Sequence, residues 1–241
     1  MKHSKRFYRD YSGISSTAFN VKIDTSDLFI RADKDLHDEA YEALKTARTE
    51  LEDYITKHDE FLHSLDPVTM HGDEGEISAI MCRASASAGV GPMAAVAGAI
   101  AEAVGRELLN YSEEVIVENG GDLWMKLVKP AVIGIYVNNI YFKDNIGIKI
   151  NPDETPCGVC TSTSKLGHSL SFGRADSVTI IAETGALADA VATAVCNMVQ
   201  TADDIGNGLE FGMKIPGVKG CLVIFRDKLG ALGNIALSPI E

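Results

Sequence analysis

A carboxylate inside an apolar helix is the most informative chemical feature of this sequence. The segment Ala186–Val199 is apolar on most sides, which is typical of a buried helix, and Asp189 lies within it. A buried carboxylate is costly unless it is paired or binds a metal. Thr193 follows four residues later on the same face, so two oxygens would stack, and Mg²⁺ prefers oxygen ligands.

A simpler arrangement explains the same spacing. Asp189 could accept a hydrogen bond from a first-turn amide or pair with an arginine, while Thr193 bonds back to the carbonyl four residues earlier. Spacing alone favours this arrangement, because short motifs match by chance often.

A second candidate site is a glycine-rich turn after a short apolar strand. The strand is predicted at Val115–Val117, and the turn residues are Glu118, Asn119, Gly120, Gly121 and Asp122. Paired glycines let a ligand approach the backbone, and the last carboxylate could bind a ribose hydroxyl or an amine. A tight turn without a ligand explains these residues equally well.

A third candidate set lies in a polar stretch further along the chain. Thr161 and Ser162 offer hydroxyls and His168 an imidazole, and such loops can bind phosphates. Arg174 could hold a phosphate through two parallel hydrogen bonds. In the alternative, the loop is simply solvated and Arg174 neutralises Asp176.

The run Gly89–Ala94 has the pattern GxGxxA and outlines a dinucleotide-binding βαβ unit. This hypothesis requires a strand at Ile77–Cys82 and places Glu118 at the end of the next strand. It would make the protein an NAD(P)-dependent oxidoreductase. Pro92 inside the run fits poorly, and the hypothesis leaves Asp189 and Thr193 without a role.

The cysteines indicate reduced thiols. There are five, irregularly spaced, which argues against a disulfide framework. Cys157 and Cys160 form a single CxxC, whereas a zinc site of this type needs a second pair. We therefore expect two reduced thiols in a turn.

Composition narrows the classes of partner. The 241 residues include 34 acidic and 22 basic side chains, and the net charge of -12 repels a phosphate backbone, so we expect no nucleic-acid partner. The N-terminal residues 1–13 lack the apolar core of a secretory signal. The most apolar stretch, Ala86–Ala101, is shorter than the ~20 residues needed to span a bilayer. We expect a cytoplasmic protein with no membrane partner.

Periodicity predicts the elements that would position these residues. Strands are expected at Ala18–Ile23, Leu28–Ala32, Ile77–Cys82, Val115–Val117, Ala131–Val137, Ile140–Phe142, Ile146–Ile150 and Ser177–Ala182, with a closing hairpin of Cys221–Phe225 and Asn234–Leu237. Helices are expected at about 35–62, 92–109 and 186–199, the last capped by Thr184. Gly158–Asp176 is expected to be mostly loop. This order predicts one α/β (α+β) domain over residues 1–241, in one or two lobes, with a mixed sheet and packed helices.

Several of these pieces together resemble the ApbE-like flavin transferases, colinearly over Gly91–Asn197. Ala94–Leu109 and Glu118–Leu123 resemble two successive family motifs, and Cys160-Thr161-Ser162 resembles the family's Ala-Thr-Ser-Gly. Ser177–Ala182 followed by Ala188–Thr193 resembles its late strand and its Ala-Asp-Ala-Leu-Ala-Thr helix, which is the most specific piece. The whole chain is more similar still to a smaller, uncharacterised branch of that superfamily.

The resemblance implies a largely antiparallel mixed sheet and a magnesium-dependent enzyme that cleaves FAD. In that family FMN passes to a Ser or Thr hydroxyl of an acceptor protein and AMP leaves, or water gives FMN and AMP. It implies Mg²⁺ ligands at the side chains of Asp189 and Thr193 and at the carbonyl of Ala94. Asp122 and its glycines would line the nucleotide pocket, and Thr161, Ser162, His168 and Arg174 would contact phosphates or the acceptor.

The sequence also departs from the family pattern. The family's lysine is Ala97 here, its opening aspartate is Gly91, and the asparagine before its glycine turn is Glu118. A different segment, His168–Asp176, stands in place of the family's histidine block. These departures favour an alternative, a binding protein that holds a flavin or another small ligand without chemistry. The macromolecular partners expected are an acceptor protein and, in a homo-oligomer, a second copy of the chain.

Overall fold

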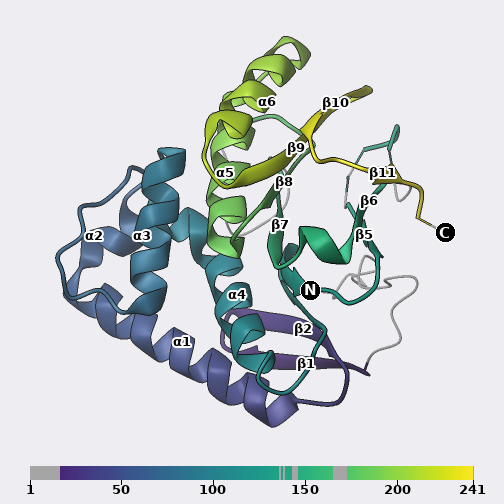
Figure 1. The fold of residues 1–241 in the computed structure, drawn as a ribbon. Coiled ribbons are helices and arrows are strands. Elements are labelled where there is room, and N and C mark those ends of the chain that lie inside the picture. The colour runs from purple at the N-terminus through teal and green to yellow at the C-terminus, as the bar shows by residue number, and fades with distance from the viewer. Residues whose placement is uncertain (1–16, 136, 138, 143–145, 165–172, 241) are drawn as a thin grey trace.

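The computed structural model describes residues 17–135, 137, 139–142, 146–164 and 173–240 (Figure 1). The strands are β1 (Thr17–Ile23), β2 (Ser26–Ala32), β3 (Val115–Asn119), β4 (Asp122–Lys126), β5 (Ala131–Gly134), β6 (Gly147–Ile150), β7 (Cys157–Ser162), β8 (Ser177–Ala182), β9 (Val218–Phe225), β10 (Lys228–Gly233) and β11 (Leu237–Ser238). The α-helices are α1 (His37–Lys57), α2 (Asp59–His63), α3 (Glu76–Ala88), α4 (Val96–Leu108), α5 (Gly185–Met198) and α6 (Ile205–Lys214). Short 3₁₀ turns are η2 (Pro92–Ala95), η3 (Pro152–Glu154) and η4 (Ala202–Asp204).

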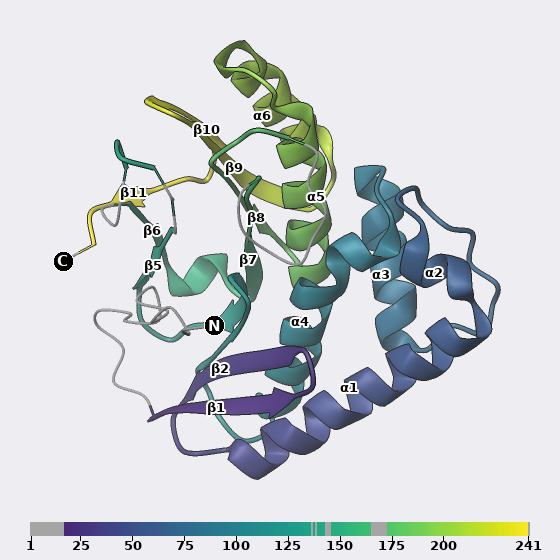
Figure 2. The same ribbon diagram turned by 180° about the vertical axis from the view of Figure 1, so that it is seen from behind.

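The main sheet has eight strands in the order β1-β2-β3-β4-β7-β8-β9-β10, and every neighbouring pair is antiparallel. A second sheet, β11-β6-β5, is also antiparallel. The helices lie on one side of the main sheet and the second sheet lies on the other (Figures 1 and 2). The predicted largely antiparallel sheet with packed helices is confirmed.

The main sheet separates two apolar cores, and strand alternation explains how. On β8, Val178 and Ile180 belong to the core shared with the helices, whereas Ile181 belongs to the core shared with β5 and β6. Successive side chains of a strand point to opposite faces, so a central strand covered on both sides is apolar throughout. All six residues of β8 are buried accordingly.

Helices α4 and α5 cross in backbone contact. A Cβ atom built on Gly98 would lie 2.2 Å from the carbonyl oxygen of Gly185, and one on Gly185 would lie 2.3 Å from the carbonyl oxygen of Gly98. Only glycine on both helices permits this approach. Glu102 reinforces the crossing, because its buried carboxylate accepts the amide N–H of Gly185 at 2.7 Å.

Three predicted elements differ in the structure, and so does the predicted closing hairpin. Ile77–Cys82 is part of helix α3, because a short apolar run does not distinguish strand from helix and the buried positions Ile77, Met81 and Ser85 recur every four residues. Ile140–Phe142 is a turn. Cys157–Ser162 is strand β7 rather than loop, so its two thiols lie on a strand and not in a turn.

The closing hairpin pairs β9 with β10 instead of Asn234–Leu237. The connection is tighter than predicted, because Arg226 adopts a positive φ of 53° and turns the chain directly after β9. Helix α6 was not expected at all. All five cysteines are free and buried, as expected for reduced thiols.

No single helix in the described part of the chain is long and apolar enough to cross a membrane. The pair Glu76–Ala88 and Pro92–Leu108, bent by 102°, passes that test jointly on length and composition.

The helix crossing gives a stability prediction. Gly98→Ala should lower the free energy of unfolding by about 1–3 kcal/mol, because the new methyl group would collide with backbone of a second helix. In an isolated helix the same change would be favourable by ~1 kcal/mol. Urea denaturation measures the difference.

The matched control is Gly206→Ala in α6, where an added Cβ meets no atom within 4 Å. This variant should be as stable as the original or slightly more stable. Equal stability of the two alanine variants would contradict the close crossing.

Candidate functional site

The carboxylate of Asp189 lies in the second turn of α5 and is held by the backbone of α4. Its Oδ2 accepts the amide N–H of Gly98 at 2.9 Å, and the side chain is only 7% exposed. The helix begins as predicted, with Thr184 Oγ1 accepting the amide of Leu187 at 3.2 Å. Thr193 lies one turn further along and is also buried. The simpler arrangement was right about an amide, but the amide belongs to another helix.

The glycine-rich turn connects β3 to β4 and is tied to the same helix α4. Gly120 and Gly121 have φ values of 69° and 112°, a region that disfavours other residues. The amide of Gly121 donates to Glu118 Oε1 at 3.1 Å. Asn119 Nδ2 donates to the carbonyl of Ala97 at 3.2 Å, next to the residue that binds Asp189. Two neighbouring residues at the start of α4 therefore hold both the turn and the Asp189 carboxylate.

The end of β7 lies beside the glycine-rich turn and, with Asp122 and Asp189, forms the cluster of the candidate site. The amide of Thr161 donates to Asp122 Oδ1 at 3.1 Å, because β7 pairs with β4 in the sheet. Thr161 Oγ1 and Thr179 Oγ1 lie 2.9 Å apart in a hydrogen bond between β7 and β8. Thr161 and Ser162 are partly exposed. Strand alternation places the Thr161 hydroxyl, like Val159 and Ile181, on the side of the second sheet, whereas Ser162 lies with Cys160 on the helix side.

Two carboxylates of the cluster resist ionisation. Burial, and then the charge of Asp122, raise the pKa of Asp189 well above its ordinary value, although amides of Gly98 and Ala97 oppose the rise. Burial raises the pKa of Asp122 to about 7, with the nearby Glu118 charge adding to it. Among the described residues, neither Asp122 nor Asp189 forms an ion pair with a basic side chain. Such a pair either stays protonated or requires a nearby positive charge.

Cys160 also belongs to the cluster, although the sequence did not indicate this position for it. Its Sγ lies 3.5 Å from the carbonyl oxygen of Gly185, and burial raises the pKa of its thiol well above the ordinary value. A neutral buried thiol is a poor nucleophile, so Cys160 packs the site rather than reacting. Its position on β7, directly before Thr161, would have indicated this place had β7 been recognised as a strand.

The donor set fits a hard divalent cation. Asp189 and Thr193 offer oxygens on one face of α5, and Ala94 lies in η2, which packs against α5. Carboxylate, hydroxyl and carbonyl oxygens are the ligands that Mg²⁺ prefers. The raised pKa of Asp189 shows that burial makes its negative charge costly, and a bound cation would offset that cost.

One predicted site residue, Arg174, lies away from this cluster, and another lies outside the described residues. The amide of exposed Arg174 donates to the carbonyl of Val199 at 2.8 Å, which places its backbone at the C-terminal end of α5. Asp189 lies ten residues earlier, roughly 15 Å along a helix of 1.5 Å rise per residue. His168 lies outside the described residues.

The dinucleotide hypothesis is wrong for Gly89–Ala94. That fingerprint follows a strand and opens a helix within a βαβ unit. Here helix α3 precedes the run, and Gly89, with φ 71°, ends α3. The first glycine of the run is thus a helix C-cap, not part of a phosphate-binding turn.

Comparisons with solved structures show the fold. The apo flavinyl transferase ApbE of Pseudomonas stutzeri superimposes with a TM-score of 0.59 at 13% identity, over 91% of this chain and 94% of that chain. The flavin transferase ApbE of Vibrio cholerae gives a TM-score of 0.51 at 13% identity, over 91% and 97%.

Comparisons of sequence show the family. The family model described as "AbpE bacteria" matches residues 11–207. A UPF0280 protein of Methanocaldococcus jannaschii is 40% identical over 227 residues, 92% of this chain and 89% of that protein. A UPF0280 protein of Methanobrevibacter smithii is 40% identical over 222 residues, 88% and 92%. The chain therefore belongs to the AbpE bacteria family, as one of the UPF0280 proteins within the ApbE-like superfamily.

Proposed function

We propose that this protein is a magnesium-dependent enzyme acting on a flavin nucleotide, cleaving FAD to FMN and AMP or transferring FMN to a protein Ser or Thr hydroxyl. The observation that carries the proposal is the pair of carboxylates without a basic partner, Asp189 and Asp122, beside a glycine turn at which an added Cβ would meet no atom within 4 Å. The fold adds support, because the proteins that share it include flavin transferases. A hard cation and a diphosphate together suit this cluster of oxygens.

The proposed reaction exchanges one phosphorus–oxygen bond for another. The oxygen of the acceptor hydroxyl, or of water, bonds to the phosphorus on the FMN side of the diphosphate. The bond from that phosphorus to the bridging oxygen breaks, AMP leaves with that oxygen, and the acceptor's proton goes to a base. Such transfers depend mainly on positioning and charge neutralisation, so the chain needs no nucleophile of its own.

Each part of the cluster then has a role. Asp189, Thr193 and the carbonyl of Ala94 would hold Mg²⁺, which supplies charge neutralisation at the phosphate oxygens. The turn with Asn119, Gly120 and Gly121 would let the nucleotide approach the backbone, and Glu118 and Asp122 would line its pocket. We assign Ser162 to phosphate contacts and Thr161 to the positioning of Asp122 through its amide, and keep His168 and Arg174 as residues that contact phosphate or the acceptor.

A flavin-binding protein without chemistry is the second candidate. Ala97 favours it, because its methyl side chain stands where the related flavin transferases carry a lysine, directly before the amide that holds Asp189. This candidate predicts tight FAD binding with no AMP release at any magnesium concentration.

The test of both candidates is incubation with FAD, with and without Mg²⁺, followed by chromatography for FMN and AMP. Magnesium-dependent AMP release is the expected result. Asp189→Asn should lower the rate by about 100-fold or more, because stabilisation by a bound metal is worth several kcal/mol. The control is Asp53→Asn, an exposed aspartate of α1. Undiminished release from a folded Asp189→Asn variant would refute the metal assignment.

Thr193 gives a finer test of the same ligand set. Thr193→Val preserves the buried shape but removes the hydroxyl, so the Mg²⁺ concentration for half-maximal AMP release should rise by about 10-fold or more, equivalent to ~1.4 kcal/mol. Thr193→Ser keeps the oxygen and should restore most of the affinity. Equal magnesium dependence of the Val and Ser variants would exclude Thr193 as a ligand.

A further inference from the structure

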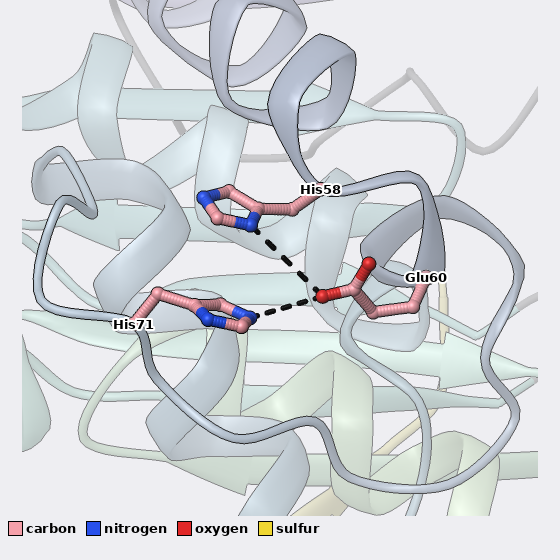
Figure 3. A group of neighbouring side chains, drawn as sticks. All are labelled: His58, Glu60 and His71. Atoms are coloured by element: carbon pink, nitrogen blue, oxygen red, sulfur yellow. Dashed lines mark hydrogen bonds and ion pairs between the residues drawn. The ribbon is translucent and has the colours of Figure 1, made fainter.

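A separate cluster of histidines and carboxylates occupies the corner between α1 and α3. His58 follows α1, Glu60 lies in α2, and His71 lies in the segment that leads to α3 (Figure 3). One ligand atom from each of the three lies within 4.8 Å of the others. The cluster shares no residue with the candidate site around Asp189.

The two imidazoles point nitrogen atoms at one carboxylate oxygen. Glu60 Oε1 lies 3.0 Å from His71 Nε2 and 4.0 Å from His58 Nδ1 (Figure 3). In a tetrahedral zinc site with bonds of ~2.0–2.1 Å, neighbouring ligand atoms are about 3.3 Å apart. The His71–Glu60 pair is already this close, whereas the His58–Glu60 pair must contract.

The other nitrogen of His58 already has the partner that a metal-binding histidine requires. His58 Nε2 lies 3.0 Å from Asp73 Oδ1 and 3.2 Å from Oδ2. A proton on Nε2, donated to this carboxylate, leaves the lone pair of Nδ1 free to face Glu60. Metal-binding histidines almost always make such a bond, which fixes the tautomer and raises the basicity of the ligand nitrogen.

The segment that carries His71 is also anchored. The carboxylate of Glu74 accepts the amide of His71, the amide of Gly72 at 3.0 Å and the hydroxyl of Tyr54 at 3.0 Å. The rings of His58 and His71 stack with centroids 4.2 Å apart at 13°. A shared ion requires the His71 ring to tilt out of this stack, which its 43% exposed side chain has room to do.

We propose that His58 Nδ1, His71 Nε2 and Glu60 form a binding site for a zinc-class divalent ion, with water in the fourth position. Imidazole nitrogen favours Zn²⁺ over Mg²⁺, which takes oxygen ligands. The ion would fasten the segment after α2 to the end of α1. This segment also contacts the backbone just before η2, which carries Ala94. A Cβ built on Gly91 would lie 1.8 Å from the carbonyl oxygen of Ser64.

The test is a titration of the untagged, chelator-treated full chain with Zn²⁺ in competition with a chromophoric chelator. Asp189→Asn is used as the background, so that any ion at the candidate flavin site does not contribute. One ion per chain is expected in this background, whatever the outcome for the proposed function. Co²⁺ should give the intense visible absorption of a four- or five-coordinate site, and Mg²⁺ in excess should not displace it.

Three variants decide which residues bind the ion. Asp73→Asn should weaken binding by about 10–100-fold, as the loss of an outer hydrogen-bond partner does, and His71→Ala and Glu60→Gln at least as much. The control is His63→Ala, an α2 histidine with a 67% exposed side chain outside the cluster. Circular dichroism establishes that each variant is folded. Absence of zinc binding, or binding that His71→Ala and Glu60→Gln leave unchanged, overturns the proposal.

Discussion

The contact between the backbones of α4 and α5 is the constraint on which the candidate site depends. Because Gly98 and Gly185 lack side chains, the two helices approach closely enough for the Gly98 amide to reach the Asp189 carboxylate. The same helix α4 supports the glycine turn through the carbonyl of Ala97 and Asn119. Any residue larger than glycine at the crossing would move the two halves of the site apart.

Two buried carboxylates, those of Glu102 and Asp189, accept backbone amides across this crossing, but the charges around them differ. Glu102 accepts the amide of Gly185 at the N-terminus of α5, where the helix dipole favours a negative charge, and Arg106 Nη2 lies 2.7 Å from its other oxygen. Asp189 also accepts an amide, but the charge it faces is that of Asp122. A carboxylate beside another negative charge destabilises a fold when it is ionised, and a bound cation would offset that cost.

Local signals in the sequence predicted the elements that carry the site. The apolar helix with Asp189, its Thr184 cap and the turn at Gly120 all follow from periodicity and turn chemistry over a few residues. These local signals did not predict the partner of Asp189. That partner, the amide of Gly98, lies 91 residues away in sequence, and only the crossing of α4 and α5 brings it close. Strand β7 was missed for a related reason. Its glycine and polar residues suit a loop in isolation, and only pairing with β4 and β8 makes them a strand.

The same limit applies more strongly to the His58 cluster. Its histidines are 13 residues apart by number, in segments without periodicity, so no spacing rule brings them together. Packing does so, since the segment after α2 folds back over the end of α1. That segment then contacts Gly91 through the carbonyl of Ser64, and Gly91 begins the turn that presents Ala94 to α5. An ion that fixed this corner would therefore hold one wall of the candidate site in place from outside it. The two imidazole nitrogens at the corner would disfavour Mg²⁺ there.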